Sequence, residues 1–236
     1  MIRRFPLLRS AKELASLVDE IGFLPFFMNS IPGFSVEEST PGELWFSEGA
    51  DGPWEWKGPA IEQSNCAYGK FFQNKAMYIS AEWFPDFANY RRDGYDFEGF
   101  YGDGFARSQD KKLIDALNRT GPVLSKTLKR EAGYAGKDGL KGFDGTLTRL
   151  QMQTFVLTDG IEYMTDKYGQ PYGWGVCRYA TPEQRYGEDC FADVYELPPE
   201  ESKRRLLNHL QKLLPDADGD ALMRLLGKPA TNRGNS

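Results

Sequence analysis

Three polar side chains in the middle of the chain have the chemistry of DNA base recognition. Thr146, Arg149 and Gln153 are separated by three and four residues, so a helix would present them on one face. Arginine donates paired hydrogen bonds to guanine, and glutamine pairs in a similar way with adenine. Leu147 and Leu150 recur at helical spacing beside them. The pattern predicts a helix that buries its leucines and turns Thr146, Arg149 and Gln153 outward, toward DNA.

Basic side chains that could contact phosphate lie on both sides of this helix in the sequence. Lys126, Lys129 and Arg130 fall on the outer face of a second predicted helix, for which Ser125 is a candidate N-cap. Lys167 lies in a later segment with the residue types of a turn. Because phosphate contacts by lysine and arginine supply most of the non-specific affinity for DNA, we expect these four side chains to bind the DNA backbone.

The elements that must position these residues follow one another in the order of a winged helix. Apolar spacing predicts helices at 110–119, from Ser125 and from Asp144, the last as N-cap. Strands are predicted at 155–157, 161–164 and 172–179, with turns at 159–160 and 166–171. Three short helices followed by a hairpin are typical of a winged helix, whose third helix enters the major groove.

The fold class predicted for the whole chain is α+β, in three parts. An aromatic-rich N-terminal region at 1–106 could hold a second, degenerate winged helix, although its residues 29–60 have the composition of a loop with short strands. The clear winged helix covers 107–180. A C-terminal helical segment and tail cover 181–236, with helices over 198–227 and a disordered end from Lys228.

The distribution of charge restricts where DNA could bind. The chain has 29 Lys and Arg against 34 Asp and Glu, a net charge of −5, which excludes a protein that binds nucleic acid over its whole surface. Residues 107–157 nevertheless hold ten basic and five acidic side chains, whereas residues 37–62 and 181–201 each hold seven acidic and one basic. DNA contact must therefore be local to the basic middle of the chain.

Other catalytic chemistry finds little support. His209 is the sole histidine and lies in a leucine-rich helix, so we expect a satisfied histidine on the helix surface rather than a catalytic base. The cysteines Cys66, Cys177 and Cys190 lack the close pairs of a zinc site. No cofactor and no metal are expected.

The expected cellular compartment rests on three sequence features: membrane spans, signal peptides and cysteine pairs. No run of about 18 apolar residues is present, so no membrane span is expected. The first residues show no signal-peptide pattern, and three scattered cysteines are no disulfide framework. We expect a cytoplasmic protein, and the sequence does not indicate an oligomeric state.

Five segments along most of the chain together resemble the AlkZ/YcaQ-type winged-helix DNA glycosylases, in particular their AlkZ-related branch. They are Leu17–Leu24, Trp54–Lys57, Trp83–Phe87 with Arg91–Arg92, Gly121–Leu128 and Gly175–Tyr179. The resemblance implies a DNA-binding fold, a role in DNA repair, and double-stranded DNA as the partner. It also implies a catalytic Gln-x-Gln or Gln-x-Asp pair just after the first segment, which would position a water against the sugar of a damaged nucleotide.

At the positions of that pair this sequence has Pro25 and Phe27. Neither side chain can hydrogen-bond a water or act as a base. Gln151 and Gln153 spell the same pattern, but they lie in the third predicted helix, where residues two apart do not share a face. The leading interpretation is therefore a winged-helix protein that binds DNA without the catalytic pair.

Two alternatives remain open at this stage. One is an active glycosylase for alkylated or cross-linked bases, with Gln151 and Gln153 as the water-positioning pair. The other is a non-enzymatic protein-interaction module, for which the acidic segment at 37–62 is the reason.

Overall fold

A six-stranded antiparallel sheet connects the two halves of the chain. The computed structural model describes residues 4–46, 51–165, 167–168 and 171–231. Its strands are β1 (Phe23–Pro25), β2 (Ala67–Phe72), β3 (Lys75–Ile79), β4 (Val123–Leu124), β5 (Leu157–Thr165) and β6 (Pro171–Ala180). In space they follow the order β1-β3-β2-β5-β6-β4. Tyr68 of β2 pairs with Thr158 of β5, and this contact joins the halves.

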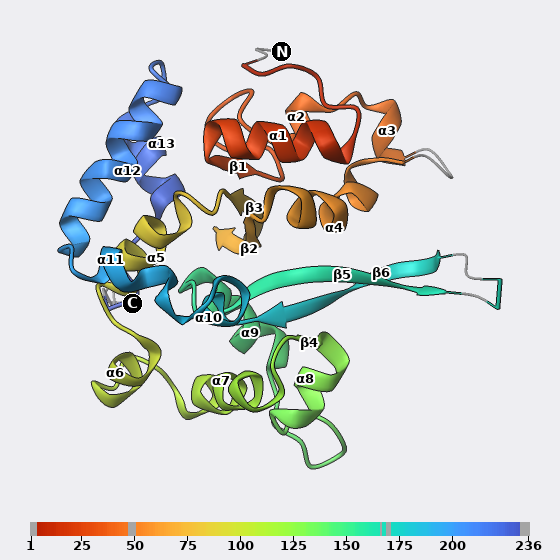
Figure 1. Ribbon diagram of the computed structural model, residues 1–236, viewed down its shortest axis with the longest axis vertical. Helices are drawn as coiled ribbons and strands as arrows, with labels where there is room; N and C mark the ends of the chain where they lie inside the picture. The colour runs from red at the N-terminus through yellow and green to blue at the C-terminus, as the bar shows by residue number, and fades with distance from the viewer. Residues whose placement is uncertain (1–3, 47–50, 166, 169–170, 232–236) are drawn as a thin grey trace.

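Helices surround the sheet (Figure 1). The N-terminal half contains α1 (Ala11–Ile21), α2 (Val36–Ser39), α3 (Glu43–Phe46), α4 (Pro53–Ser64), α5 (Phe84–Arg92) and α6 (Phe97–Gly102). The second half contains α7 (Ser108–Thr120), α8 (Ser125–Glu131) and α9 (Phe143–Met152). After β6 follow α10 (Pro182–Tyr186), a 3₁₀ turn (Glu188–Phe191), α11 (Ala192–Tyr195), α12 (Pro199–Leu213) and α13 (Gly219–Leu226).

The order of elements is repeated in the two halves. In the first, α1, β1 and α4 precede the β2–β3 hairpin, and β1 pairs with β3. In the second, α7, β4, α8 and α9 precede the β5–β6 hairpin, and β4 pairs with β6. The short strand thus pairs with the second strand of the hairpin in both halves, and the first strands of the two hairpins meet at the centre of the sheet.

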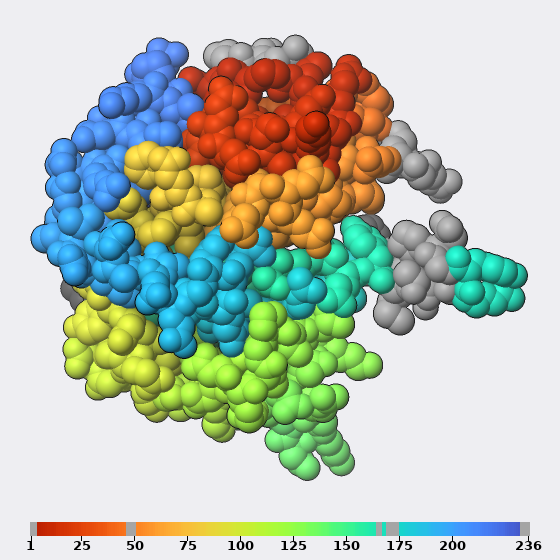
Figure 2. Space-filling view, in the orientation of Figure 1, coloured from red at the N-terminus to blue at the C-terminus, as the bar shows by residue number. Residues whose placement is uncertain are grey.

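Apolar side chains form two separate cores. The larger joins α1, α4, α5 and the sheet to the C-terminal helices α12 and α13, so the end of the chain packs on its beginning. The smaller lies among α6, α7, α8 and α9. Figure 2 shows the C-terminal helices (blue) against the N-terminal half (red to orange), with the helices of the second half (green) below.

The predicted helix positions are largely confirmed, with local corrections. Ser10 caps α1 by accepting a hydrogen bond from the Glu13 backbone N–H at 3.2 Å, and Gly22 ends it. The caps predicted at Ser125 and Asp144 are wrong, because Leu124 and Gly142 occupy those positions. Gly142 has a φ of 82°, which permits the sharp entry into α9.

Two further corrections concern strands and loops. Residues 157–165 form one continuous strand in which the register shifts between Thr158 and Gly160, so the turn predicted at 159–160 is a bulge-like irregularity instead. The loop predicted at 29–60 contains α2, α3 and the first part of α4. Pro53 at the start of α4 is compatible with a helix, since the N–H it lacks would have no partner there. The tail from Lys228 is described to Thr231, and its remainder lies outside the described residues.

Burial of Cys66 makes a prediction about thiol reactivity. This side chain is fully buried in the larger core, and burial raises the pKa of its thiol to about 11. The thiolate is the reactive form, so we expect Cys66 in the native protein to resist iodoacetamide at pH 8. Mass spectrometry of alkylated peptides checks this. Cys177, which is partly exposed, serves as the internal comparison. Equal native rates at the two cysteines would contradict the prediction.

Candidate nucleic-acid interface

Three adjoining hollows follow the outer side of α9. The first, of about 520 Å³, lies at the start of the helix and includes Lys129 and Lys141 in its lining. The second, of about 650 Å³, runs beside the middle of α9, and the third, of about 490 Å³, lies at its end. Neighbouring hollows share lining residues, so they form one continuous surface.

The charged side chains along this surface are mainly basic. Among the described residues that line the three hollows, the cations are Lys70, Arg107, Lys129, Lys141 and Arg149, and the anions are Asp110 and Asp144. We call this surface the α9 band. Its excess of positive charge attracts a polyanion, in contrast to the net charge of the chain.

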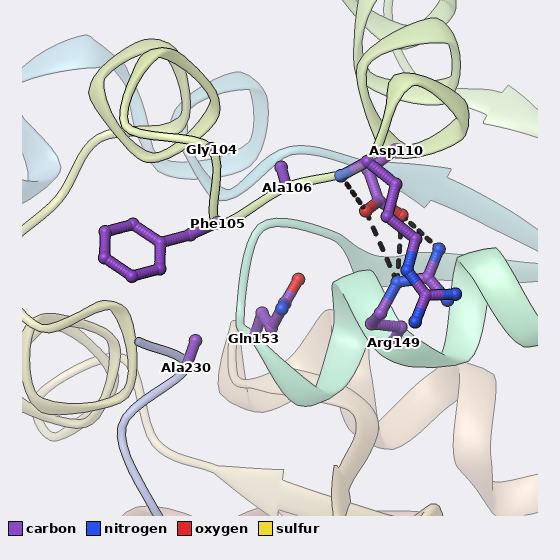
Figure 3. A pocket seen from close by; sticks show the side chains of 8 residues that line it. Gly104, Phe105, Ala106, Asp110, Arg149, Gln153 and Ala230 are labelled. Carbon is purple, nitrogen blue, oxygen red and sulfur yellow. Dashed lines mark hydrogen bonds and ion pairs between the residues drawn. The ribbon is translucent and has the colours of Figure 1, made fainter. Parts of the chain in front are cut away.

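Arg149 is held in place by a buried carboxylate. Its Nε donates to Asp110 Oδ1 at 3.0 Å, and Nη2 donates to the same oxygen (Figure 3). The Asp110 side chain is 1% exposed, and its Oδ2 also accepts from the Arg107 backbone N–H at 2.8 Å. Arg149 retains 26% exposure of its side chain. The ion pair therefore fixes the guanidinium at the surface and leaves part of it accessible, which reduces the entropy lost on binding.

Thr146 does not lie on the outer face, and this part of the prediction is wrong. The residue is 2% exposed, and the Tyr134 hydroxyl donates to its Oγ1 at 3.1 Å. The reason is the width of the buried stripe of α9. Thr146 lies three residues after Phe143 and four before Leu150, both of which are buried, so all three share the inward face.

Gln151 and Gln153 have different surroundings. Gln151 is buried, and its Oε1 accepts from the Lys70 backbone N–H at 2.9 Å. A Cβ at Gly69 would approach this oxygen to 3.1 Å, so the close contact of α9 with β2 favours glycine there. Gln153 caps the end of α9 and lines the third hollow. The amides therefore do not form a joint site, and Gln151 serves to fasten α9 to the first half.

Lys70 is a site residue that the sequence pattern did not indicate. It extends from β2, and its Nζ donates to Thr148 Oγ1 on α9 at 3.3 Å. The contact joins residues 78 positions apart in the chain. No local spacing carries such information, because only the pairing of the two half-sheets brings Lys70 to α9.

The other predicted phosphate contacts lie around the band. Lys126 and Lys129 are exposed on α8, and Arg130 is exposed but pairs with Glu131 at 3.0 Å. Lys167 is exposed beyond the end of β5, and its Nζ lies 4.9 Å from the centroid of the Tyr168 ring. The β5–β6 hairpin extends away from the body of the molecule (Figure 1). Lys167 is not among the described residues that line the three hollows.

Comparison with known protein families matches residues 8–227 to the AlkZ-related family. The match covers nearly the whole chain. This protein belongs to the AlkZ-related family. Membership points to a DNA-binding or DNA-glycosylase-like function. Comparisons with curated proteins and with solved structures gave no match.

In this AlkZ-related chain, positions 25 and 27 contribute to apolar packing. Pro25 is buried in β1 at the edge of the sheet, where a missing N–H is tolerated. The Phe27 ring lies 6.1 Å from the Trp54 ring, measured between centroids. Lys57 lies over the same cluster, with Nζ 4.7 Å from the centroid of the Trp54 ring, and burial lowers the pKa of its amine. Neither Pro25 nor Phe27 offers a hydrogen-bonding side chain.

His209 is satisfied, but it packs between elements instead of lying free on a helix surface. Its ring stacks on Trp83 with the centroids 4.2 Å apart, and Nε2 lies 2.9 Å from the Ile21 carbonyl oxygen. The histidine therefore connects α12 to the end of α1. Within the part of the chain that the structure describes, no group of three or more His, Cys, Asp or Glu could hold a metal ion. No helix among the described residues is long and apolar enough to cross a bilayer.

Proposed function

We propose that this AlkZ-related protein binds double-stranded DNA along the α9 band and does not excise bases. The observation that carries the proposal is the band itself, a continuous basic surface on a chain whose net charge is −5. Residues 107–180 act as a winged helix in this proposal, since their order of three helices and a hairpin, with β4 paired to β6, is that of the fold. The N-terminal half acts as a second, degenerate unit.

Within this interface α9 approaches the major groove. Arg149 and Gln153 contact base edges, and Lys126, Lys129, Arg130 and Lys141 contact phosphates. Lys70 extends the phosphate contact across to the first half. Lys167 on the projecting hairpin meets the backbone farther along the duplex. The absence of hydrogen-bonding side chains at positions 25 and 27 is the reason to propose binding without glycosylase chemistry.

Removal of phosphate contacts tests the proposal. In the variant Lys126→Ala/Lys129→Ala/Lys141→Ala we expect weaker binding of a labelled duplex, measured by fluorescence anisotropy over a salt series. Each lost contact lowers the slope of log affinity against log salt by about 1, so the triple variant should lose about 3. Arg149→Ala should also weaken binding, but it leaves the buried Asp110 carboxylate unpaired, so Asp110→Asn/Arg149→Met is the cleaner variant.

Lys212→Ala is the matched control, because Lys212 is exposed on α12 and lies outside the α9 band. An unchanged salt slope in the triple variant would contradict the proposed surface. No binding at low salt and micromolar protein would overturn the function and favour an interaction module. Abasic sites appearing in alkylated DNA would show that the protein has a catalytic group elsewhere.

A further inference from the structure

The third hollow of the α9 band is a pocket with few, well-placed polar groups. Its volume of about 490 Å³ lies in the usual range for small-ligand sites. The loop between α6 and α7 forms one wall, and the end of α9 forms the opposite wall (Figure 3). The lining consists of Gly104, Phe105, Ala106, Arg107, Asp110, Arg149, Gln153 and Ala230.

Gln153 supplies an unmet hydrogen-bond acceptor in this pocket. Its Oε1 is buried and accepts no hydrogen bond from the described residues. A buried carbonyl oxygen without a donor is unfavourable, so a ligand that donates a hydrogen bond to it gains affinity. Figure 3 shows the Gln153 amide pointing toward the loop that carries Ala106, with Arg149 to one side.

Arg149 supplies donors beside that acceptor. The two residues are four positions apart at the end of α9, and such residues are neighbours on a helix surface. Asp110 neutralises the charge of the guanidinium and fixes its plane. The paired charge makes the pocket a poor site for a phosphate, which needs uncompensated positive charge. A neutral ligand with an acceptor next to donors fits better.

We infer that this pocket holds an unpaired guanine of bound DNA. Guanine presents O6 to the Arg149 guanidinium and its adjacent N1–H and N2–H₂ groups to Gln153 Oε1. The base must be unpaired, because inside a duplex those groups are occupied and a base reaches a protein pocket only when it leaves the stack. This inference rests on the proposed DNA binding and specifies its ligand. The pocket belongs to the second half and is separate from positions 25 and 27.

Three duplexes of one sequence test the inference side by side. One is fully paired, one carries a single bulged guanine and one a single bulged thymine. Measured by anisotropy at one salt concentration, the wild-type protein should bind the guanine bulge about tenfold more tightly than the other two. Gln153→Leu should make the affinity for the guanine bulge equal to the affinity for the thymine bulge, and Gln211→Leu, at an exposed glutamine of α12, should retain the preference for guanine.

A chemical readout locates the base. Kethoxal reacts with N1 and N2 of unpaired guanine, so the bulged guanine should be protected in the wild-type complex and reactive in the Gln153→Leu complex. Equal affinity for the three duplexes, a preference that survives Gln153→Leu, or an unprotected guanine would each overturn the inference. Failure of the paired duplex to bind at all would instead overturn the proposed function.

Discussion

Replacing Arg92 with alanine is expected to lower the free energy of unfolding by about 3–5 kcal/mol, because it removes a buried charged side chain together with its hydrogen bonds to Glu183, Tyr195 and Thr154. The Arg92 side chain is 1% exposed, and its guanidinium lies 4.6 Å from the ring centroids of both Phe155 and Phe191. Nη1 donates to Glu183 Oε1 at 3.1 Å. Burial alone lowers the pKa of Arg92, but Glu183 and Tyr195 outweigh it and raise the pKa overall, so the side chain stays charged.

The second reason for a large effect is the backbone that Arg92 supports. Its Nη2 donates to the Thr154 carbonyl oxygen at 2.8 Å, and Nε donates to Thr154 Oγ1 at 3.2 Å. Thr154 has a φ of 66°, an unfavourable value for a β-branched residue. These bonds hold the strained turn that leads from α9 to β5, so loss of Arg92 should loosen the end of the α9 band as well.

Urea unfolding followed by tryptophan fluorescence measures the effect. Arg204→Ala is the control, because that arginine is exposed on α12 and pairs across the helix surface with Glu201. We expect its midpoint to match the wild type. If Arg92→Ala also unfolded at the wild-type urea concentration, the hydrogen bonds and packing of the buried guanidinium would contribute nothing to stability.

Replacing Gly22 with alanine is expected to cost about 2–4 kcal/mol. Gly22 has a φ of 80°, which a side chain disfavours, and a Cβ there would lie 2.6 Å from Trp83 Cδ1. The indole is stacked on His209 and packed at the start of α5, so it cannot move aside without disturbing the contact between α1 and α12. Backbone strain and overpacking therefore both contribute to the loss of stability in Gly22→Ala.

Gly219→Ala isolates the effect of adding a methyl group. Gly219 begins α13 at ordinary helical φ, and a Cβ there would have no neighbour within 4 Å. Its unfolding midpoint should stay near that of the wild type. Equal stability of the Gly22→Ala variant, measured in the same denaturation experiment, would contradict the steric argument.

Local sequence pattern was sufficient to locate the helices of the second half. The spacing of Leu113, Ile114 and Leu117 marks α7, and Leu147 and Leu150 mark α9, because burial of one face repeats at the helical period. The pattern was less informative for α4, whose glycine and prolines resemble a loop. Long-range packing of Trp56 and Ile61 in the larger core stabilises that helix despite its composition.

In the candidate site, too, some features follow from the sequence alone and others only from long-range packing. Sequence alone determined the AlkZ-related resemblance, the basic middle of the chain, and the apolar residues at positions 25 and 27, because residue types in order are sufficient for each. Only the tertiary structure decided that Thr146 is buried, that Asp110 fixes Arg149 across 39 positions, and that Lys70 joins the α9 band. The physical reason is that these properties depend on contacts between segments far apart in the chain, and helical or strand periodicity describes only neighbours along it.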